Sequence, residues 1–402
     1  MKNSEQPVYL NAGEASAELS ISPATLYAYV SRGLIRSEPG ESARSRRYRA
    51  EDVRALKNRR APASERNPMY GDADVPVLDS AITEITADGP LYRGTLASAL
   101  ADRASLEQAA TLLWDASAND PFAPFNMPFV SDAMADVFRV ARDAKPVDRT
   151  IAVLALATEA DPHAFNRTAE GRASLGARIL RLVTGAILSQ SPTARPAHIE
   201  IAEAWCRDHK DGADLIRRAL VTLADHELNA STFAARCAAS TGVSLYDAVI
   251  VGLAALKGPR HGGAGPRASH FVASLEEGHA HAIIRERVAL GERLPGFGHL
   301  LYGKGDPRAV ALLGALKKAK APQSLISDVP RWVEEATGEA PNVDYAMGIL
   351  IRHLGLPTGS ELSLFAVART VGWVAHAIEQ LQKGGLIRPR ARYVGPSAGR
   401  KR

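Results

Sequence analysis

Three short segments in the C-terminal half of the chain each place one proton-handling side chain among turn-forming residues. The reactive members are His261, His299 and Asp344, and glycine, proline or asparagine stands close beside each of them. Such residues suit tight turns and close approach of the backbone to another group. Two imidazoles and one carboxylate are the groups needed to take a proton from carbon and to give one to oxygen. We therefore predict that the carboxylate is a base and that the imidazoles stabilise oxygens on which negative charge develops.

The elements that must bring these segments together are predicted to be mainly α-helices. From residue 96 onward the apolar residues repeat with a period close to 3.6, and the alternation typical of strands is rare. Only residues 81–92 look extended, which predicts a small hairpin before the helices. The apolar stripes that show the helical period are Leu175, Ile179, Leu182, Val183 and Ile187; Leu215, Ile216, Ala219, Leu220 and Leu223; and Leu364, Val367, Val371, Ala375 and Ile378, the last with Glu379 and Gln380 on another face.

Length and composition indicate a soluble protein of more than one domain. A chain of 402 residues is too long for one ordinary core, and 46% hydrophobic with 23% charged residues is the balance of a globular protein. The longest apolar run, Ala248–Leu256, is far shorter than the roughly 20 residues of a membrane helix. No apolar signal-peptide core follows Met1, so we expect a cytoplasmic protein. The cysteines, Cys206 and Cys237, are expected to be buried thiols rather than a disulfide or a metal site.

The first 60 residues have the pattern of a compact helix-turn-helix module. Asn11 followed by Glu14 predicts a capping box, and Ser22 before Pro23 predicts the start of a second helix. A basic run follows, and residues 1–66 hold 12 Lys or Arg against 8 Asp or Glu. Most of the mild net charge of +5 therefore lies in the first sixth of the chain.

This module resembles the winged helix-turn-helix of the MerR-like and excisionase-like families. The resemblance rests on residues 22–27, 33–35 and 47–53. It implies that the second helix enters the major groove of DNA, while the wing meets phosphates, which position a protein without reading sequence. The alternative is a module kept for protein contacts. The residues expected at the groove are Ala24, Thr25, Tyr27 and Ala28, and those expected at the phosphates are Arg44, Arg46, Arg47 and Arg49.

The rest of the chain resembles the citrate synthase family from about residue 78 to about residue 395. The segments of His261, His299 and Asp344 match the active-site motifs of that family in order. A single glycine–histidine pair would carry no information, whereas so many ordered motifs are a specific signal. The further motifs, in family order, are residues 81–85 running to 91–94, 225–232, 306–308, 368–373 and 388–389.

The resemblance implies a mainly α fold, in which a large helical domain contains an inserted small helical domain and follows the winged helix-turn-helix module. It also implies a homodimer, because the family's third substrate arginine, matched by Arg388, reaches across from the partner subunit. The boundaries that we predict are 1–60 for the module, 61–76 for a linker, 77–262 with 361–395 for the large domain, 263–360 for the small domain and 396–402 for a basic tail.

The reaction implied by the resemblance is condensation of an acyl-CoA with a 2-oxo acid, followed by hydrolysis of the thioester. Asp344 matches the base, His261 matches the neutral group that hydrogen-bonds the thioester oxygen, and His299 matches the donor to the 2-oxo carbonyl. A dicarboxylate substrate needs fixed cations, and guanidinium groups bind carboxylates in a bidentate manner. The residues that match its binding groups are His226, Arg308, Arg369 and Arg388.

The loops that meet CoA in the family depart from the family pattern in this chain. Leu300 and Gly303 stand where basic residues are usual, Arg260 replaces a leucine, and residues 265–267 replace an asparagine or acidic residue and its neighbours. We predict that nearby cations take over the contacts to the phosphates of acyl-CoA. The candidate CoA-binding residues are Arg260, Pro295, Gly296, Phe297, Gly298 and Lys304, with Arg267 as a further cation.

The first functional interpretation is an active synthase that joins acetyl-CoA and oxaloacetate to give citrate and CoA, as in the tricarboxylic acid cycle. A 2-methylcitrate synthase that uses propionyl-CoA is a close variant, because one methylene changes the preference of a pocket by only about 1–3 kcal/mol. The second interpretation is a DNA-binding regulator whose synthase-like body senses a metabolite. No permanently bound cofactor is expected, since acyl-CoA is a co-substrate. No metal is expected either, because His279 and His281 lack further ligands nearby.

Overall fold

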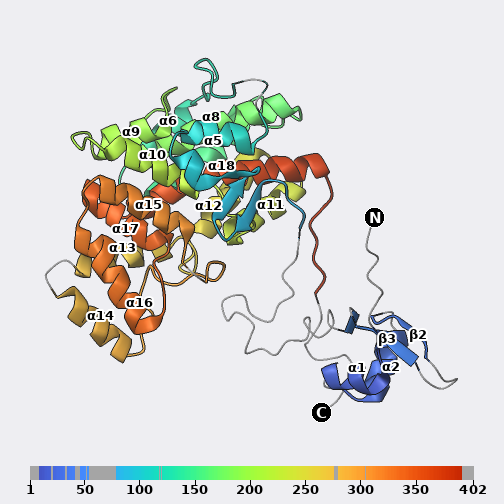
Figure 1. The fold of residues 1–402 in the computed structure, drawn as a ribbon. Helices are drawn as coiled ribbons and strands as arrows, with labels where there is room; N and C mark the ends of the chain where they lie inside the picture. Colours follow the sequence, from blue (N-terminus) through green and yellow to red (C-terminus); the bar gives the residue numbers. More distant parts are fainter. Residues whose placement is uncertain are drawn as a thin grey trace, which may run out of the picture. The chain divides into compact units, whose positions relative to one another are not determined.

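The structure, a computed structural model, describes residues 9–19, 21–31, 34–40, 46–50, 52–53, 78–116, 118, 120–275, 279–303 and 305–391. The chain divides into two compact units, residues 1–77 and 78–402. Figure 1 colours the chain from blue at the N-terminus to red towards the C-terminus, so the helices and strands of the N-terminal unit are blue. None of the helices in these ranges is long and apolar enough to cross a membrane.

The N-terminal unit packs two short helices against a small antiparallel sheet with the strand order β1-β3-β2. Its core is a cluster in which Leu26, Ile35 and Tyr48 are almost fully buried. The β2–β3 pair forms where the sequence predicts the wing. The elements are β1 (Tyr9–Leu10), α1 (Ala12–Leu19), α2 (Pro23–Ser31), β2 (Ser37–Pro39) and β3 (Arg46–Arg49).

Both predicted helix starts are confirmed in this unit. Asn11 N donates to Glu14 Oε2 at 2.8 Å, and Glu14 N donates to Asn11 Oδ1 at 2.9 Å, which is a capping box. Ser22 Oγ accepts from Thr25 N at 3.2 Å at the start of α2. Gly33, the predicted end of that helix, lies outside the described residues.

The larger unit begins with a three-stranded antiparallel sheet in the order β4-β5-β6. The predicted hairpin is confirmed, since Thr83 pairs with Tyr92 and Thr86 pairs with Gly89. The third strand is missing from the prediction because two residues are too few for strand alternation to show. The strands are β4 (Thr83–Thr86), β5 (Gly89–Tyr92) and β6 (Thr95–Leu96).

Helices make up most of the rest of the larger unit, as the apolar period predicts (Figure 1). One hydrophobic cluster runs through them and contains every residue of the predicted apolar stripes. The division into a large domain and a small domain at residues 263–360 stays a prediction. The helices are α4 (Ala97–Ala101), α5 (Leu106–Leu113), α6 (Asp132–Val140), α7 (Pro146–Ala160), α8 (Ala169–Leu188), α9 (Ala197–Trp205), α10 (Gly212–Leu223), α11 (Ala230–Ser240), α12 (Leu245–Leu256), α13 (Ala264–Ser274), α14 (Ala280–Ala289), α15 (Pro307–Lys318), the π-helix η1 (Ser324–Asp328), α16 (Val329–Thr337), α17 (Val343–Leu354) and α18 (Ser360–Lys383).

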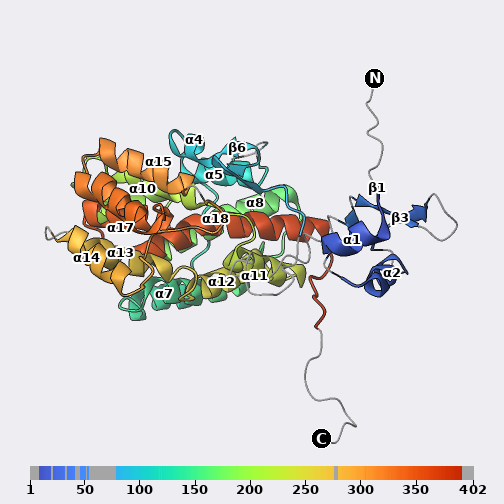
Figure 2. The ribbon, with the colours of Figure 1, turned by 60° about the horizontal axis from the view of Figure 1, so that its bottom comes forward.

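The helix α18 spans 24 residues and passes through the middle of the larger unit, with α8 and α10 on one side and α11 and α12 on the other (Figure 2). It is buried all round along most of its length. Glu379 and Gln380, which the sequence places on a face apart from the apolar stripe, are buried as well. Arg236 of α11 explains this, because its guanidinium donates to Glu379 Oε2 at 2.6 Å and to Gln380 Oε1 at 3.0 Å.

Two glycines allow the close packing around α18. A Cβ on Gly372 would lie 2.3 Å from Asp225 Oδ1 and 2.6 Å from the carbonyl oxygen of Ala224. A Cβ on Gly252 of α12 would lie 2.6 Å from the ring of Trp373. Both glycines therefore leave the space that the side chains of Asp225 and Trp373 occupy.

Candidate active site

Hydrogen bonds between two loops hold the segments of His299 and Asp344 side by side. Asn342 N donates to Gly296 O, and Asn342 Nδ2 donates to Gly298 O, both at 2.9 Å. The φ angles of +86° at Gly296 and +74° at Gly298 explain why glycine occupies both positions. The glycine-rich loop therefore lies against the start of α17, where Asp344 stands in the first turn.

His261 lies in the loop between α12 and α13 and contacts a hydroxyl group of α11. Its Nε2 lies 2.7 Å from Ser231 Oγ, and Trp373 Nε1 donates to the same oxygen at 3.2 Å. Burial, and then the charge of Arg369, lower the pKa of His261 to about 4. The imidazole is therefore neutral at pH 7, so it can offer an uncharged N–H to a ligand.

His299 has a backbone donor at Nδ1 and the guanidinium of Arg308 close to Nε2. Leu301 N donates to Nδ1 at 3.1 Å, and Arg308 Nη2 lies 3.2 Å from Nε2. Burial and the charge of Arg308 lower the pKa of His299 to about 4, so the ring is neutral at pH 7. Because Nδ1 accepts from the backbone, we assign the single proton of the neutral ring to Nε2. Nε2–H and the guanidinium are then two neighbouring donors, which suits an oxygen acceptor.

Arg308 is held by a buried carboxylate two residues before it. Its Nε and Nη2 donate to the two oxygens of Asp306 at 3.0 and 2.9 Å. Asp306 Oδ2 also accepts from Val343 N at 3.0 Å, at the first residue of α17. One carboxylate therefore fixes both the guanidinium and the helix start that carries Asp344.

Asp344 has the properties of a base rather than of a helix cap. Its backbone N donates to Asn342 Oδ1 at 3.0 Å, so Asn342 is the residue that caps α17. Burial raises the pKa of Asp344 to about 6; Arg308 acts against the rise, Asp306 adds to it, and Arg267 acts against it. A carboxylate with this pKa is mostly ionised at pH 7 and is a stronger base than an ordinary aspartate.

His226 is the third neutral imidazole of the site. Its ring centroid lies 5.7 Å from that of His299. Its Nε2 lies 3.0 Å from Tyr302 Oη. Burial raises the pKa of Tyr302 to about 12, so its hydroxyl keeps its proton and can donate to Nε2. Burial, followed by the charges of Arg308 and Arg369, holds the pKa of His226 well below its ordinary value. The proton of this ring is then on Nδ1.

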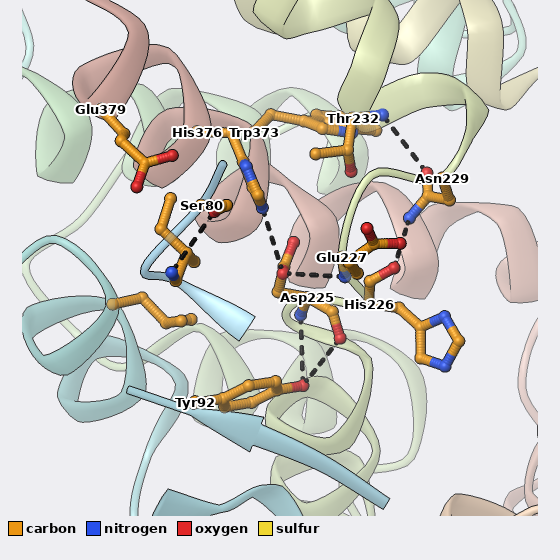
Figure 3. A network of polar contacts seen from close by, with 12 residues as sticks. Ser80, Tyr92, Asp225, His226, Glu227, Asn229, Thr232, Trp373, His376 and Glu379 are labelled. Atoms are coloured by element: carbon orange, nitrogen blue, oxygen red, sulfur yellow. Dashed lines mark hydrogen bonds and ion pairs between the residues drawn. The ribbon is translucent and has the colours of Figure 1, made fainter. Parts of the chain in front are cut away.

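A fully buried carboxylate, Asp225, organises the loop between α10 and α11 (Figure 3). Its Oδ2 accepts from Glu227 N at 3.1 Å and lies 3.3 Å from His376 Nε2 of α18. The Tyr92 hydroxyl lies 3.1 Å from Asp225 O at the end of α10. Burial raises the pKa of Asp225, but His376 and Arg369 outweigh burial and hold it below its ordinary value. Asp225 is therefore ionised and partly compensates the charge of Arg369.

Within this chain the structure brings together all but one of the predicted catalytic and substrate-binding residues. Arg369 is 3% exposed, and its Nε donates to Leu223 O at 3.0 Å. Arg388 is exposed beyond the end of α18, and none of its contacts in the described part of the chain is with this group. The residues that lie together are His226, His261, His299, Arg308, Asp344 and Arg369.

Most of the predicted CoA-binding residues lie in loops beside these groups. Arg260 is exposed next to His261, and Arg267 is exposed near the start of α13. Phe297 is 5% exposed and packs against other aromatic rings, so its side chain belongs to the core. Lys304 lies outside the described residues. The other predicted members, Pro295, Gly296 and Gly298, belong to the glycine-rich loop that carries His299.

Four polar side chains that position the site have no role in the prediction from sequence. Ser231, Asp306 and Trp373 stand inside the matched motifs, so their place in a motif is a usable signal. Tyr302 stands outside those motifs, and its contact with His226 becomes visible only in the fold. In the ranges that the structure describes, no cluster of three or more His, Cys, Asp or Glu side chains is placed to hold a metal ion.

The N-terminal unit exposes several of the predicted DNA-binding side chains. Tyr27 of α2 is 53% exposed, and Arg46 and Arg47 of β3 are exposed. Arg46 Nη1 donates to Ser37 Oγ at 3.0 Å, and Arg47 lies 5.1 Å from the centre of the Tyr9 ring. The remaining predicted contacts are Thr25 and Arg49, which are partly buried, Arg44, which lies outside the described residues, and Ala24 and Ala28, whose side chains are not described.

Comparison with protein families agrees with both resemblances. A family model described as "Citrate synthase, C-terminal domain" matches residues 71–390. A second, described as "MerR HTH family regulatory protein", matches residues 10–78. The N-terminal unit is therefore a MerR-type helix-turn-helix domain.

Individual relatives include both a citrate synthase and a 2-methylcitrate synthase. A citrate synthase from Haloferax volcanii is 36% identical over 192 residues, which cover 46% of this chain and 50% of that protein, so the chain spans about half the length of that relative. A 2-methylcitrate synthase from Corynebacterium glutamicum is 29% identical over 337 residues, which cover 76% of this chain and 88% of that protein. The structure is also similar to citrate synthase from Thermoplasma acidophilum in ternary complex with carboxymethyl coenzyme A and oxaloacetate. The TM-score is 0.68 at 25% identity, over 83% of this chain and 98% of that one.

Proposed function

Because the chain belongs to the citrate synthase family, we propose that it condenses acetyl-CoA with oxaloacetate and releases citrate and CoA. The observation that supports this most directly is the convergence of three neutral imidazoles, a carboxylate with a pKa of about 6 and two buried guanidinium groups. These are the groups that a carbon-acid condensation with a dicarboxylate requires.

In the first step Asp344 takes a proton from the methyl carbon of the thioester. The electron pair of that C–H bond forms the C=C bond of the enol, and the π pair of the thioester carbonyl moves onto its oxygen, which His261 stabilises with its N–H. Ser231 Oγ lies 2.7 Å from Nε2, so a hydroxyl proton donated there leaves the imidazole proton on Nδ1, directed away from Ser231. A neutral donor of this kind can match an enol oxygen better than an imidazolium ion would.

In the second step the enol carbon attacks the 2-oxo carbon of oxaloacetate and forms the new C–C bond. The carbonyl oxygen gains the displaced electron pair and takes a proton from His299 Nε2. Arg308 Nη2 lies 3.2 Å from that same nitrogen, which supports the proposal that its guanidinium binds the adjacent carboxylate. Arg369 and His226 supply further donors. Water then hydrolyses the thioester to citrate and CoA.

The choice between acetyl-CoA and propionyl-CoA depends on small packing differences. Citrate synthases and 2-methylcitrate synthases both stand among the relatives of this chain. One methylene in an apolar pocket changes the preference by about 1–3 kcal/mol, which is roughly 10- to 200-fold. We propose acetyl-CoA as the acyl donor, and the synthesis of 2-methylcitrate from propionyl-CoA as the alternative.

The decisive experiment measures thiol release from acetyl-CoA and from propionyl-CoA in the presence of oxaloacetate. Wild type should turn over at least one donor, and Asp344→Asn should be inactive with both. If wild type turns over neither donor, the enzymatic proposal fails. The alternative function, a regulator whose synthase-like unit binds a metabolite, would then be the better explanation.

Arg388 supports the proposal of a homodimer with shared active sites. Ile387 N, directly before it, donates to Ser240 Oγ at 3.1 Å at the far end of α11 from Ser231. A mixture of Asp344→Asn and Arg388→Ala chains tests the sharing. If Arg388 serves the partner subunit's site, mixed dimers regain one complete site, and activity returns on mixing. If it serves its own chain, the mixture stays inactive.

The MerR-type domain supports DNA binding as a second function of the same chain. Tyr27 on α2 and the arginines Arg46 and Arg47 on β3 are exposed, which suits groove and phosphate contacts respectively. The full chain should bind duplex DNA with an affinity that falls steeply as salt rises. Arg47→Gln should reduce the salt dependence. Binding that ignores salt would contradict phosphate contacts by the wing.

A further inference from the structure

A cavity of about 330 Å³ lies in the larger unit, apart from the candidate active site. Its wall consists of the loop between α7 and α8, the loop between α11 and α12, and the residues that end α18. None of the active-site residues placed above belongs to this wall. The helix α12 begins at the cavity and ends at the loop of His261, about 17 Å away at the helical rise per residue.

The charged groups in the cavity wall are all positive. Arg167 and Arg172 line it, and the described wall contains no acidic side chain. Two carboxylates close to the wall already have donors: Asp161 accepts from the hydroxyl of Tyr246 at 2.9 Å, and Asp247 accepts from Ser244 Oγ at 2.7 Å. The cavity therefore favours a negatively charged ligand.

Arg172 differs from the other buried arginines of the larger unit. It is 9% exposed, yet within the ranges that the structure describes its guanidinium makes no hydrogen bond and no ion pair. Burial and the neighbouring Arg167 lower its pKa, but a guanidinium keeps its proton at any pH at which the protein is folded. The other buried arginines all have acceptors: backbone carbonyls for Arg149, Arg181 and Arg369, Glu379 for Arg236 and Asp306 for Arg308.

Further features of the wall suit an oxyanion. Asn166 Oδ1 accepts from Thr168 N and Oγ1, both at 2.9 Å, and its Nδ2 makes no hydrogen bond with any described residue. The helices α8 and α12 start beside the wall, and the N-terminal end of a helix carries partial positive charge. Phe165, 64% exposed, and Leu381 add apolar surface next to the charged groups.

We propose that this cavity is a binding site for a small organic oxyanion, whose phosphate or carboxylate group accepts hydrogen bonds from Arg172 and Arg167. The carbon skeleton of the ligand lies on Phe165 and Leu381. The volume is larger than a lone phosphate ion needs and falls at the lower end of small-molecule sites. An oxyanion would also give the buried guanidinium the bidentate partner that the protein does not provide.

The test is isothermal titration of the full chain with inorganic phosphate and, separately, with malonate, at constant ionic strength. The variants are Arg172→Gln and Arg167→Gln. The control is Arg139→Gln, which removes an exposed arginine of α6 outside the cavity. Because malonate can also occupy the active-site arginines, only the part of its binding that Arg172→Gln abolishes counts for this cavity. The stronger probe identifies the ligand group as phosphate or carboxylate.

Wild type and Arg139→Gln should bind at least one probe, and Arg172→Gln should bind it about tenfold or more weakly. Without any probe, Arg172→Gln should melt at the same temperature as wild type or above it, because the change removes a buried cation that has no partner. Unchanged affinity in Arg172→Gln would overturn the proposal, as would no binding of either probe to wild type. A lower melting temperature of Arg172→Gln without a probe would overturn it too, since the guanidinium would then already have a partner.

Discussion

Replacement of the candidate base by its neutral isostere should abolish activity and stabilise the fold. The pKa of Asp344 is about 6 in the folded protein, against 3.8 in a model peptide. Since the folded state binds this proton more tightly than the unfolded state, stability falls as pH rises from about 3.8 to about 6 and stays reduced above that range. The difference between 3.8 and about 6 corresponds to roughly 3 kcal/mol at pH 7. Asp344→Asn removes this penalty.

Thermal melting of wild type and Asp344→Asn between pH 4 and pH 8 measures the difference. The variant should melt higher at pH 7, and its advantage should shrink as pH falls and disappear near pH 4. The control is Asp136→Asn, which changes an exposed aspartate of α6 and should show little dependence on pH. Melting of Asp344→Asn below wild type at pH 7, or a difference that does not depend on pH, would refute the reasoning.

Three further predictions concern the groups around this base. In wild type, kcat/KM should fall about tenfold per pH unit below pH 6 as Asp344 takes up its proton; a flat profile from pH 5 to pH 7 would contradict this role. Ser231→Ala should lower kcat about tenfold with an unchanged circular dichroism spectrum, because His261 loses its hydrogen bond; unchanged kcat would show that the hydroxyl does not orient the ring. Gly372→Ala should lower the free energy of unfolding in denaturant by about 2–4 kcal/mol, because its Cβ would overlap Asp225, and a loss below 0.5 kcal/mol would mean that the neighbours move aside easily.

Local patterns were sufficient to predict the mainly helical character of the larger unit and two helix starts in the smaller one. The helix caps at Asn11 and Ser22 depend on residues three positions apart, so they can be predicted from the sequence without knowledge of the tertiary structure. The apolar stripes are likewise buried as predicted, because a period of 3.6 places them on one helix face. The burial of Glu379 could not be predicted in this way, since its partner Arg236 is 143 residues away in sequence.

The candidate site was predicted as a set of residues but not as an arrangement. Ordered motifs identify His261, His299 and Asp344, and the structure places their segments together. Motifs do not show that Asp306 joins Arg308 to the start of α17, because that contact spans two loops. Nor do they show that the Phe297 side chain is buried, since the pattern of a glycine-rich loop suggests exposure.

The anchoring of the C-terminal segment has a consequence for how the protein behaves in dilute solution. Ser240 and Ser231 stand at opposite ends of α11, about 14 Å apart at the helical rise per residue. The backbone N of Ile387 is hydrogen-bonded to Ser240, and the imidazole of His261 is hydrogen-bonded to Ser231. The Cα atom of Arg388 lies about 3.8 Å from that of Ile387. The hydrogen bond of Ile387 to Ser240 therefore limits how far the guanidinium of Arg388 can reach within its own chain. Under the shared-site proposal, specific activity should therefore decline when the enzyme is diluted below the concentration at which two chains remain associated.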